Sequence, residues 1–245
     1  MNPKIYIHEF IEVIGHNRAK YMHHMTANWV PTAIEERNMR CFGVWGTVGS
    51  TGRWPEVVNV WELEGWNGLA ANFAHELRGS GLQDPSLAEW WAAAAELRRG
   101  GFDRILVPMP WSPTIDELVG TGTRGATYAH ELVTLPVGTA ARYLDAIDEV
   151  GRSVLEPLGV HLVGAFRVAM RNDTEAIAIW AIPDWDIWVR FEQAWDGDGL
   201  ATWRARLVAL SADVQRTLLV DAPLSPMRLG RQPSIEDRRP LSEIT

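Results

Sequence analysis

Hydrophobic and polar positions alternate with two different periods along the first half of the chain. In KIYIHEFIEVI (4–14) apolar residues recur at nearly every second position, which predicts a strand. Residues 17–38 then shift to three- and four-residue spacing, which predicts a helix. Further strands are expected at 41–49, 55–63 and 102–109, and further helices at 65–79 and 87–100. The expected order of elements is therefore β-α-β-β-α-β.

The second half of the chain repeats this order together with several of its residues. YIHE at 6–9 recurs as YAHE at 128–131. Trp61 and Trp66 recur with unchanged spacing as Trp180 and Trp185. Matches at several sites along both halves indicate a duplicated domain rather than a chance similarity.

A β-α-β-β-α-β unit is the ferredoxin-like arrangement, in which both helices cover one face of an antiparallel sheet. The bare faces of two such sheets can cover each other within one chain. We therefore predict an α+β fold of two tandem ferredoxin-like repeats, packed sheet to sheet as an intramolecular dimeric α/β barrel. The expected boundaries are 1–113 for the first repeat, 114–125 for a linker, 126–226 for the second repeat and 227–245 for a polar tail. We expect the tail to be disordered or to embrace a second subunit in a homodimer.

The second half also resembles a known family. YAHELVTLPVGTAARYLDAI, followed by GVHLVGAFRVAMRNDTEAIAIWAIPDWDIWVRFEQA, is similar to the NIPSNAP family of dimeric α/β-barrel proteins. The resemblance covers nearly all of 126–226 and extends through the repeat to 4–113. It implies the barrel fold, which includes cofactor-independent monooxygenases, isomerases, haem-binding enzymes and non-catalytic binding proteins. His-Glu stands in the first strand where the family often has Glu-Leu-Arg, so no active residue is carried over.

Composition narrows the classes of function. The net charge of −8 is spread along the chain without a Lys/Arg cluster, which argues against nucleic acid as a partner. No apolar run is long enough to span a membrane, and the N-terminus lacks the features of a signal peptide, so we expect a cytoplasmic protein. The single cysteine, Cys41, excludes an internal disulfide and a cysteine-cluster metal site. The 13 Trp residues indicate either an aromatic core or an aromatic-lined ligand pocket.

Positions that are polar in one repeat and apolar in the other are candidates for functional specialisation. Asn28 stands where the second repeat has Val150, and Asn59 stands where it has Ala178. Amides at otherwise apolar positions lower stability unless they meet partners or a ligand. This predicts a pocket in the first repeat, between its sheet and helix 17–38. The alternative is that Asn28 and the neighbouring His24 lie on a solvated edge of the helix.

Within that pocket we expect His8 to act as the general base, because a histidine titrates near neutral pH. Tyr6, two residues before His8, and Asn28 are expected to orient the substrate or stabilise an oxyanion. The residues predicted to bind the substrate are His24, Tyr21, Trp45, Asn59, Trp61 and Met25. A structural role for His8 stays open, because Tyr128 and His130 repeat the same pair.

We expect neither a metal nor another cofactor. His16 and His24 lie about two helical turns apart, and the sequence has no HExxH motif. His75 could serve as an axial haem ligand, which keeps a haem-binding barrel enzyme as a minor alternative. The expected function is thus a cofactor-independent isomerase, lyase or monooxygenase acting on a small apolar or aromatic metabolite. A non-catalytic small-molecule binding protein of the NIPSNAP type is the second reading.

Overall fold

The computed structural model describes residues 1–79, 81 and 83–245, and it contains the predicted order of elements twice. The strands of the first repeat are β1 (Ile5–Val13), β2 (Arg40–Thr47), β3 (Glu56–Leu63) and β4 (Arg98–Pro108). Its helices are α1 (Arg18–His23), the π-helix η1 (His24–Trp29), α2 (Val30–Arg37), α3 (Gly65–Glu76), the short η2 (Pro85–Leu87) and α4 (Ala88–Ala95).

The second repeat has the same plan. Its strands are β5 (Thr127–Thr134), β6 (His161–Val168), β7 (Glu175–Ile182) and β8 (Asp213–Asp221). Its helices are α6 (Ala140–Ala146), the π-helix η3 (Ile147–Gly151), α7 (Arg152–Leu155), η4 (Glu156–Leu158), α8 (Trp185–Asp196) and α9 (Ala201–Ala209). Each repeat therefore interrupts its first helix with a π-helical segment at the equivalent place.

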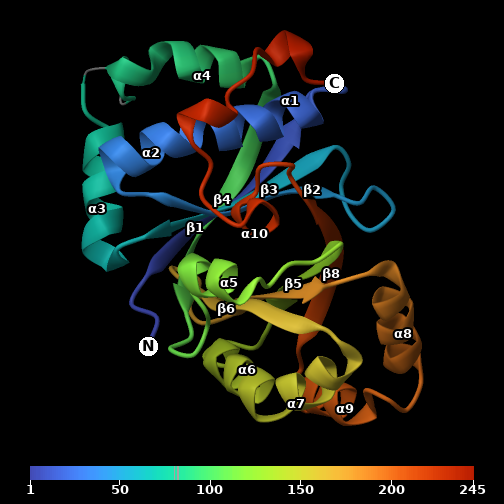
Figure 1. The fold of residues 1–245 in the computed structure, drawn as a ribbon. Coiled ribbons are helices and arrows are strands. Elements are labelled where there is room, and N and C mark those ends of the chain that lie inside the picture. Colours follow the sequence, from blue (N-terminus) through green and yellow to red (C-terminus); the bar gives the residue numbers. More distant parts are fainter. Residues whose placement is uncertain (80, 82) are drawn as a thin grey trace.

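The eight strands close into one antiparallel barrel in the order β1-β3-β2-β8-β5-β7-β6-β4. Each repeat contributes a four-stranded sheet, β4-β1-β3-β2 or β8-β5-β7-β6. Short pairings join the two sheets, with Gly46 opposite Val220 on one side and Val107 opposite Arg167 on the other. Figure 1 shows the first repeat with its helices above the barrel and the second repeat below it. The predicted fold class is confirmed.

Side chains on alternate positions of each strand face either the barrel interior or the helices. Tyr6 belongs to an interior cluster that includes Tyr128 and Phe166 of the other repeat. Ile11 and Trp61 belong instead to the layer between the first sheet and its own helices. An equivalent layer lies outside the second sheet. Residues of one strand are thus divided between two separate environments.

Glycines let large aromatic side chains fold back over their own strands inside the barrel. A Cβ atom at Gly43 would lie 2.0 Å from the indole ring of Trp45. A Cβ atom at Gly164 would lie 2.3 Å from the ring of Phe166. The strand register shifts beside both glycines, so this packing device is repeated with the domain.

The linker and the tail are both folded onto the barrel. α5 (Ile115–Thr121) begins with a capping box between Thr114 and Glu117 and places Ile115 in the interior cluster. α10 (Pro226–Leu229) adds Met227 to the same cluster, so the two helices cover one end of the barrel. No helix in the described part of the chain combines the length and hydropathy needed to cross a membrane.

Beyond α10 the tail returns to the first repeat of its own chain, where Figure 1 shows it in red beside α1 and α2. The Gln232 side chain accepts from the backbone N–H of Cys41 at 3.1 Å and donates to its carbonyl at 2.8 Å. The guanidinium of Arg238 donates to the carbonyls of Ala27 and Asn28, which lie in the π-helix η1. The tail is therefore ordered on its own barrel, while the homodimer stays a prediction.

Candidate functional site

A glutamate occupies the same position on the outer face of each sheet: Glu9 in the first repeat and Glu131 in the second. In the second repeat this glutamate forms an ion pair with Arg216. Glu131 Oε1 accepts hydrogen bonds from Arg216 Nε at 3.0 Å and Nη2 at 2.8 Å. Its Oε2 accepts from Trp180 Nε1 at 3.2 Å. The Arg216 guanidinium also lies over Phe191 and Trp195, 4.5 and 4.2 Å from the ring centroids. This ion pair is largely buried, and through Phe191 and Trp195 it connects the sheet to α8.

The equivalent Glu9 of the first repeat has amide, indole and carboxyl neighbours instead. Its Oε2 accepts from Asn59 Nδ2 at 2.8 Å and from Trp61 Nε1 at 2.9 Å. The same amide nitrogen donates to the Tyr21 hydroxyl at 3.0 Å. Within residues 1–79, 81 and 83–245, no Lys or Arg forms an ion pair with Glu9. The strand neighbour of Glu9 on β4 is Asp103, at the position where Arg216 faces Glu131 on β8.

Two carboxylates side by side change the acidity of this site. Burial raises the pKa of Glu9 to about 7, and the charge of Asp103 adds to the increase. Burial also raises the pKa of Asp103. Arg98 acts in the opposite direction on both pKa values. Glu9 can therefore both accept and release a proton near neutral pH.

Glu9 lies in the wall of an open cleft of about 810 Å³. The cleft runs along β4 between the ends of α3 and α4 and the turn after β6. Its lining comprises Ile7, Glu9, Phe73, Glu76, Leu77, Trp91, Arg98, Phe102, Asp103, Arg104, Ile105, Val168, Ala169, Met170 and Arg171. A narrow cavity of about 60 Å³ shares Glu9, Trp91 and Arg98 with the cleft and reaches Met25 and Trp61. The site thus combines apolar walls with a few charged groups.

Three of the residues predicted to bind a substrate converge on Glu9. Tyr21, Asn59 and Trp61 form the hydrogen-bonded group around its carboxylate, and Met25 lines the narrow cavity. These side chains lie between the sheet and the 17–38 segment, the place in which the sequence predicts a pocket. Glu9 and Asp103 themselves were not predicted. The contrast between Asp103 and Arg216 in the aligned repeats was the signal that could have found them.

Tyr6, His8 and Trp45 lie on the other face of the sheet, inside the barrel. The Tyr6 hydroxyl donates to Glu62 Oε2 at 2.9 Å. His8 Nε2 lies 2.9 Å from Nε2 of His130, and both imidazoles are buried. Trp45 packs against Tyr128, with ring centroids 5.7 Å apart. These three residues therefore do not share an environment with Tyr21, Asn59 and Trp61.

His24 and Asn28 pair with each other on the π-helix η1. Asn28 Nδ2 lies 3.1 Å from His24 Nδ1, and the other ring nitrogen lies 3.3 Å from the carbonyl of Trp90. The imidazole also stacks on the Trp90 indole at 4.9 Å. Since both ring nitrogens of His24 have partners, the pair joins η1 to α4, and Asn28 does not contact His8.

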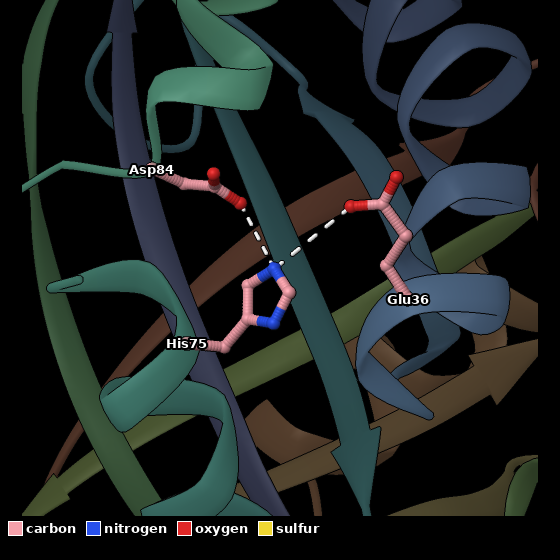
Figure 2. A group of neighbouring side chains, drawn as sticks. All are labelled: Glu36, His75 and Asp84. Atoms are coloured by element: carbon pink, nitrogen blue, oxygen red, sulfur yellow. Dashed lines mark hydrogen bonds and ion pairs between the residues drawn. The ribbon is translucent and has the colours of Figure 1, made fainter. Parts of the chain in front are cut away.

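Figure 2 shows a group of potential metal ligands formed by Glu36, His75 and Asp84, whose ligand atoms lie within 4.8 Å of one another. Asp84 is already saturated, because it accepts from His75 at 2.9 Å, Arg78 at 3.0 Å and the Ser86 hydroxyl at 2.7 Å. Arg37 also lies 3.4 Å from its Oδ2. Two guanidinium groups next to one carboxylate oppose a bound cation. The cluster is an ion-pair network that joins α2, α3 and the segment before η2.

Comparison with known proteins gives a fold without a sequence family. No family model matches the chain, and no curated protein is similar to it in sequence. A solved structure from Lactobacillus acidophilus, described as a candidate monooxygenase, is 9% identical and superposes with a TM-score of 0.54. The alignment covers 90% of this chain and 97% of that one. The chain has the dimeric α/β-barrel fold.

Two other solved structures are more distant. One described as a candidate chlorite dismutase is 11% identical, with a TM-score of 0.48 over 92% of this chain and 98% of that one. A NIPSNAP-like domain protein from Burkholderia xenovorans is 21% identical, with a TM-score of 0.37 over 46% of this chain and 92% of that one. No family model supports the NIPSNAP resemblance, and what is shown is the barrel fold.

The residues of the cleft do not suit haem, the minor alternative that His75 raised in the sequence. Haem iron needs an axial donor such as an imidazole facing the cavity. In the described part of the chain, no histidine lines the cleft. His75 is bonded to Asp84, and His24 has partners at both ring nitrogens. Two neighbouring carboxyl groups, Glu9 and Asp103, stand in the cleft instead.

Proposed function

We propose that the protein is a cofactor-independent enzyme that moves a proton on a small metabolite bound in the cleft of the first repeat, with Glu9 as the base. The observation that supports this proposal is a carboxyl group with a pKa of about 7 in a cleft wall, without an ion-pair partner among the described residues. A base with a pKa near the ambient pH is the most effective in proton transfer.

The neighbours of Glu9 support this role by fixing its orientation. Asn59 and Trp61 both donate to Oε2, so Oε1 is the oxygen that is left to accept a proton from the substrate. Tyr21 orients Asn59 in turn through its hydroxyl. Trp91, Phe102 and Ile105 provide apolar and aromatic surface for the rest of the substrate. Glu9 Oε1 can accept a proton from a carbon or nitrogen atom of the substrate. The same oxygen can then return the proton to a different atom of the substrate.

We assign the base to Glu9 rather than to His8 because of their surroundings. Burial lowers the pKa of His8 and of His130, which disfavours their protonated forms. The Nε2 of each ring is occupied by the other, and His8 does not line the cleft in the described residues. Proton transfer by Glu9 is the first step that isomerases, lyases and cofactor-independent monooxygenases share, so the proposal leaves the later steps open.

The proposal can be tested without knowing the substrate. A metabolite extract is incubated with the protein in heavy water, and mass spectrometry identifies metabolites that gain deuterium. We expect wild-type protein to label at least one metabolite, and Glu9→Gln to label it at least about 100-fold more slowly. Glu12→Gln is the matched control, because Glu12 is an exposed carboxylate on the same strand.

Equal labelling by wild-type and Glu9→Gln would refute Glu9 as the base. Retention of one metabolite by both proteins, without labelling by either, would favour the second candidate function, a non-catalytic binding protein. That reading is supported by the same cleft, since its walls are mostly apolar. A binder is expected to lose affinity gradually over several lining substitutions, whereas an enzyme loses turnover at one.

A further inference from the structure

The two repeats differ in a consistent way around their equivalent glutamates. Counting from the repeated tryptophans, Asn72 and Glu76 of α3 correspond to Phe191 and Trp195 of α8. Register across the strands makes Asp103 the counterpart of Arg216. A cation between two aromatic rings in one repeat is thus replaced by two carboxylates and an amide in the other.

In the second repeat the guanidinium of Arg216 occupies the space between Glu131, Phe191 and Trp195. The corresponding space of the first repeat opens into the cleft, which Glu9, Glu76 and Asp103 all line. Asn72 lines the narrow cavity that continues from it. Carboxylates accept hydrogen bonds and do not donate them when ionised, so this space offers acceptors where the second repeat places a donor.

Two buried oxygens in this region have no hydrogen-bond partner among the described residues, Asn59 Oδ1 and Asn72 Oδ1. The orientation of Asn59 is fixed, since its amide nitrogen must donate to the Glu9 carboxylate. Its oxygen is therefore an unsatisfied acceptor on a side chain with no exposed surface. Buried acceptors without donors are costly, and a ligand that carries N–H groups would satisfy Asn72 Oδ1, because Asn72 lines the narrow cavity.

Three carboxylates, Glu9, Glu76 and Asp103, and three arginines, Arg98, Arg104 and Arg171, line the cleft. Arg104 and Arg171 both pair with Glu175, on the far side of the cleft. Arg37 is shared between Glu76 at 3.5 Å and Asp84 at 3.4 Å. Arg98, which lies over the Trp91 ring at 5.4 Å, lowers the pKa of both Glu9 and Asp103. Among the described residues that line the cleft, Arg98 is the arginine without an ion pair, so one cation faces the two carboxylates Glu9 and Asp103.

A bare metal ion is a poor match for this space. Within the described residues, Glu36, His75 and Asp84 are the only group of three ligand residues with donor atoms inside 4.8 Å of one another. Glu9, Glu76 and Asp103 do not meet that distance, so they are too dispersed to coordinate one ion directly. A larger cation, which spreads its charge and its N–H groups over several atoms, can reach all three.

We infer that the cleft binds a small organic cation, a guanidinium, amidinium or primary ammonium group, with its charged head where Arg216 lies in the second repeat. This names the ligand class of the cleft and so rests on the proposed function for the site. Its apolar part would lie along Trp91 and Phe102 at the open side. The inferred ligand carries a positive charge, which the small apolar or aromatic metabolite expected from the sequence did not specify.

Binding of benzamidine and benzamide, measured by calorimetry on the full chain at pH 8, tests the inference. The two probes have nearly the same shape, but only benzamidine is charged. We expect benzamidine to bind at least about tenfold more tightly, because ion pairs in a partly desolvated site favour the charged probe. Asp103→Asn should weaken benzamidine about tenfold and leave benzamide unchanged. Asp116→Asn is the control, since Asp116 is an exposed carboxylate that pairs with Arg40 elsewhere.

A second variant tests whether the ligand takes the place of an arginine. Asp103→Arg places in the first repeat the residue that the second repeat has at the equivalent position, and it should abolish benzamidine binding. If Asp103→Arg does not fold, Asp103→Asn still tests the inference. Equal affinity for the two probes, no benzamidine binding at about 10 mM, or full affinity in Asp103→Asn would each overturn the inference.

The two proposals fail separately. Selective benzamidine binding without deuterium labelling would refute the enzyme and leave the cation site standing. Labelling of a neutral metabolite, together with absence of benzamidine binding, would refute the cation site and leave the enzyme standing.

Discussion

The Nε2 atoms of His8 and His130 lie 2.9 Å apart inside the barrel, where equivalent residues of the two repeats meet. Their rings are nearly parallel, with 18° between the planes. One ring must donate and the other accept, so the pair holds two neutral tautomers that differ although their sequence positions are equivalent. We therefore predict a structural role for the repeated histidine.

Replacing one member of the pair should therefore cost stability. His8→Ala leaves Nε2 of His130 buried without a partner and creates a cavity, so we expect a loss of about 2–4 kcal/mol in the free energy of unfolding. Urea denaturation measures this loss, and the exposed His16→Ala is the control. Unchanged stability combined with lost turnover would instead restore His8 as a catalytic base.

Glu9 should make stability depend on pH. Its pKa is about 7 in the folded protein against an ordinary value of 4.5, so the folded state binds more protons between these values. Stability then decreases as pH rises through that window. Glu9→Gln removes this contribution and keeps an acceptor for Asn59 and Trp61. Relative to wild type, it should gain about 1–3 kcal/mol between pH 4.5 and 8 by chemical denaturation. A gain that does not change with pH, or an equal effect of Glu12→Gln, would contradict this assignment.

Arg216 and Asp103 should respond to substitution in opposite ways. Arg216→Met leaves the Glu131 carboxylate buried without a cation, and we expect it to cost about 3 kcal/mol at pH 7. Asp103→Asn removes a negative charge beside Glu9 and should be neutral or stabilising at pH 8. Thermal unfolding of both variants at the same pH makes the comparison. Similar losses in both would mean that the two positions serve the same structural purpose.

Gly43 should tolerate no side chain while Trp45 keeps its place. A Cβ atom 2.0 Å from the Trp45 ring forces that buried indole to move, so Gly43→Ala should cost about 2 kcal/mol or more. The double variant Gly43→Ala with Trp45→Leu should recover part of the loss, which a double-mutant cycle measures. Gly120→Ala in α5 meets no atom within 4 Å and should leave stability unchanged or raise it.

The fold could be predicted from the sequence because the hydrophobic period and the internal repeat agree. YxHE at 6–9 and 128–131 marks equivalent first strands, and the strand order then follows from the ferredoxin-like plan. The helix α5 was not predicted, because glycine and threonine in 114–125 suggested a linker. The sequence does contain features typical of a helix there: a capping box formed by Thr114 and Glu117, and the apolar residues Ile115 and Leu118, which are buried.

The site could be predicted only in part. Comparison of repeats singled out Asn59, since an amide replaces an alanine there, and the structure brings Asn59 together with Tyr21 and, through Glu9, with Trp61. Glu9 escaped because Glu131 is identical to it, and the two differ only in the strand residue opposite, Asp103 or Arg216. Alternation also shows that His8 and Glu9 face opposite ways, but it does not show which face forms the barrel interior.

The helix α5 joins the two sheets within one chain. Each half of the barrel therefore has its own stretch of sequence. In a barrel built from two copies of one chain, every substitution appears on both sides at once. Here a substitution at Asp103 alters one side only, while the other side keeps Arg216. After a duplication of this kind, one half of the protein can acquire new chemistry while the other half keeps the residues that stabilise the barrel.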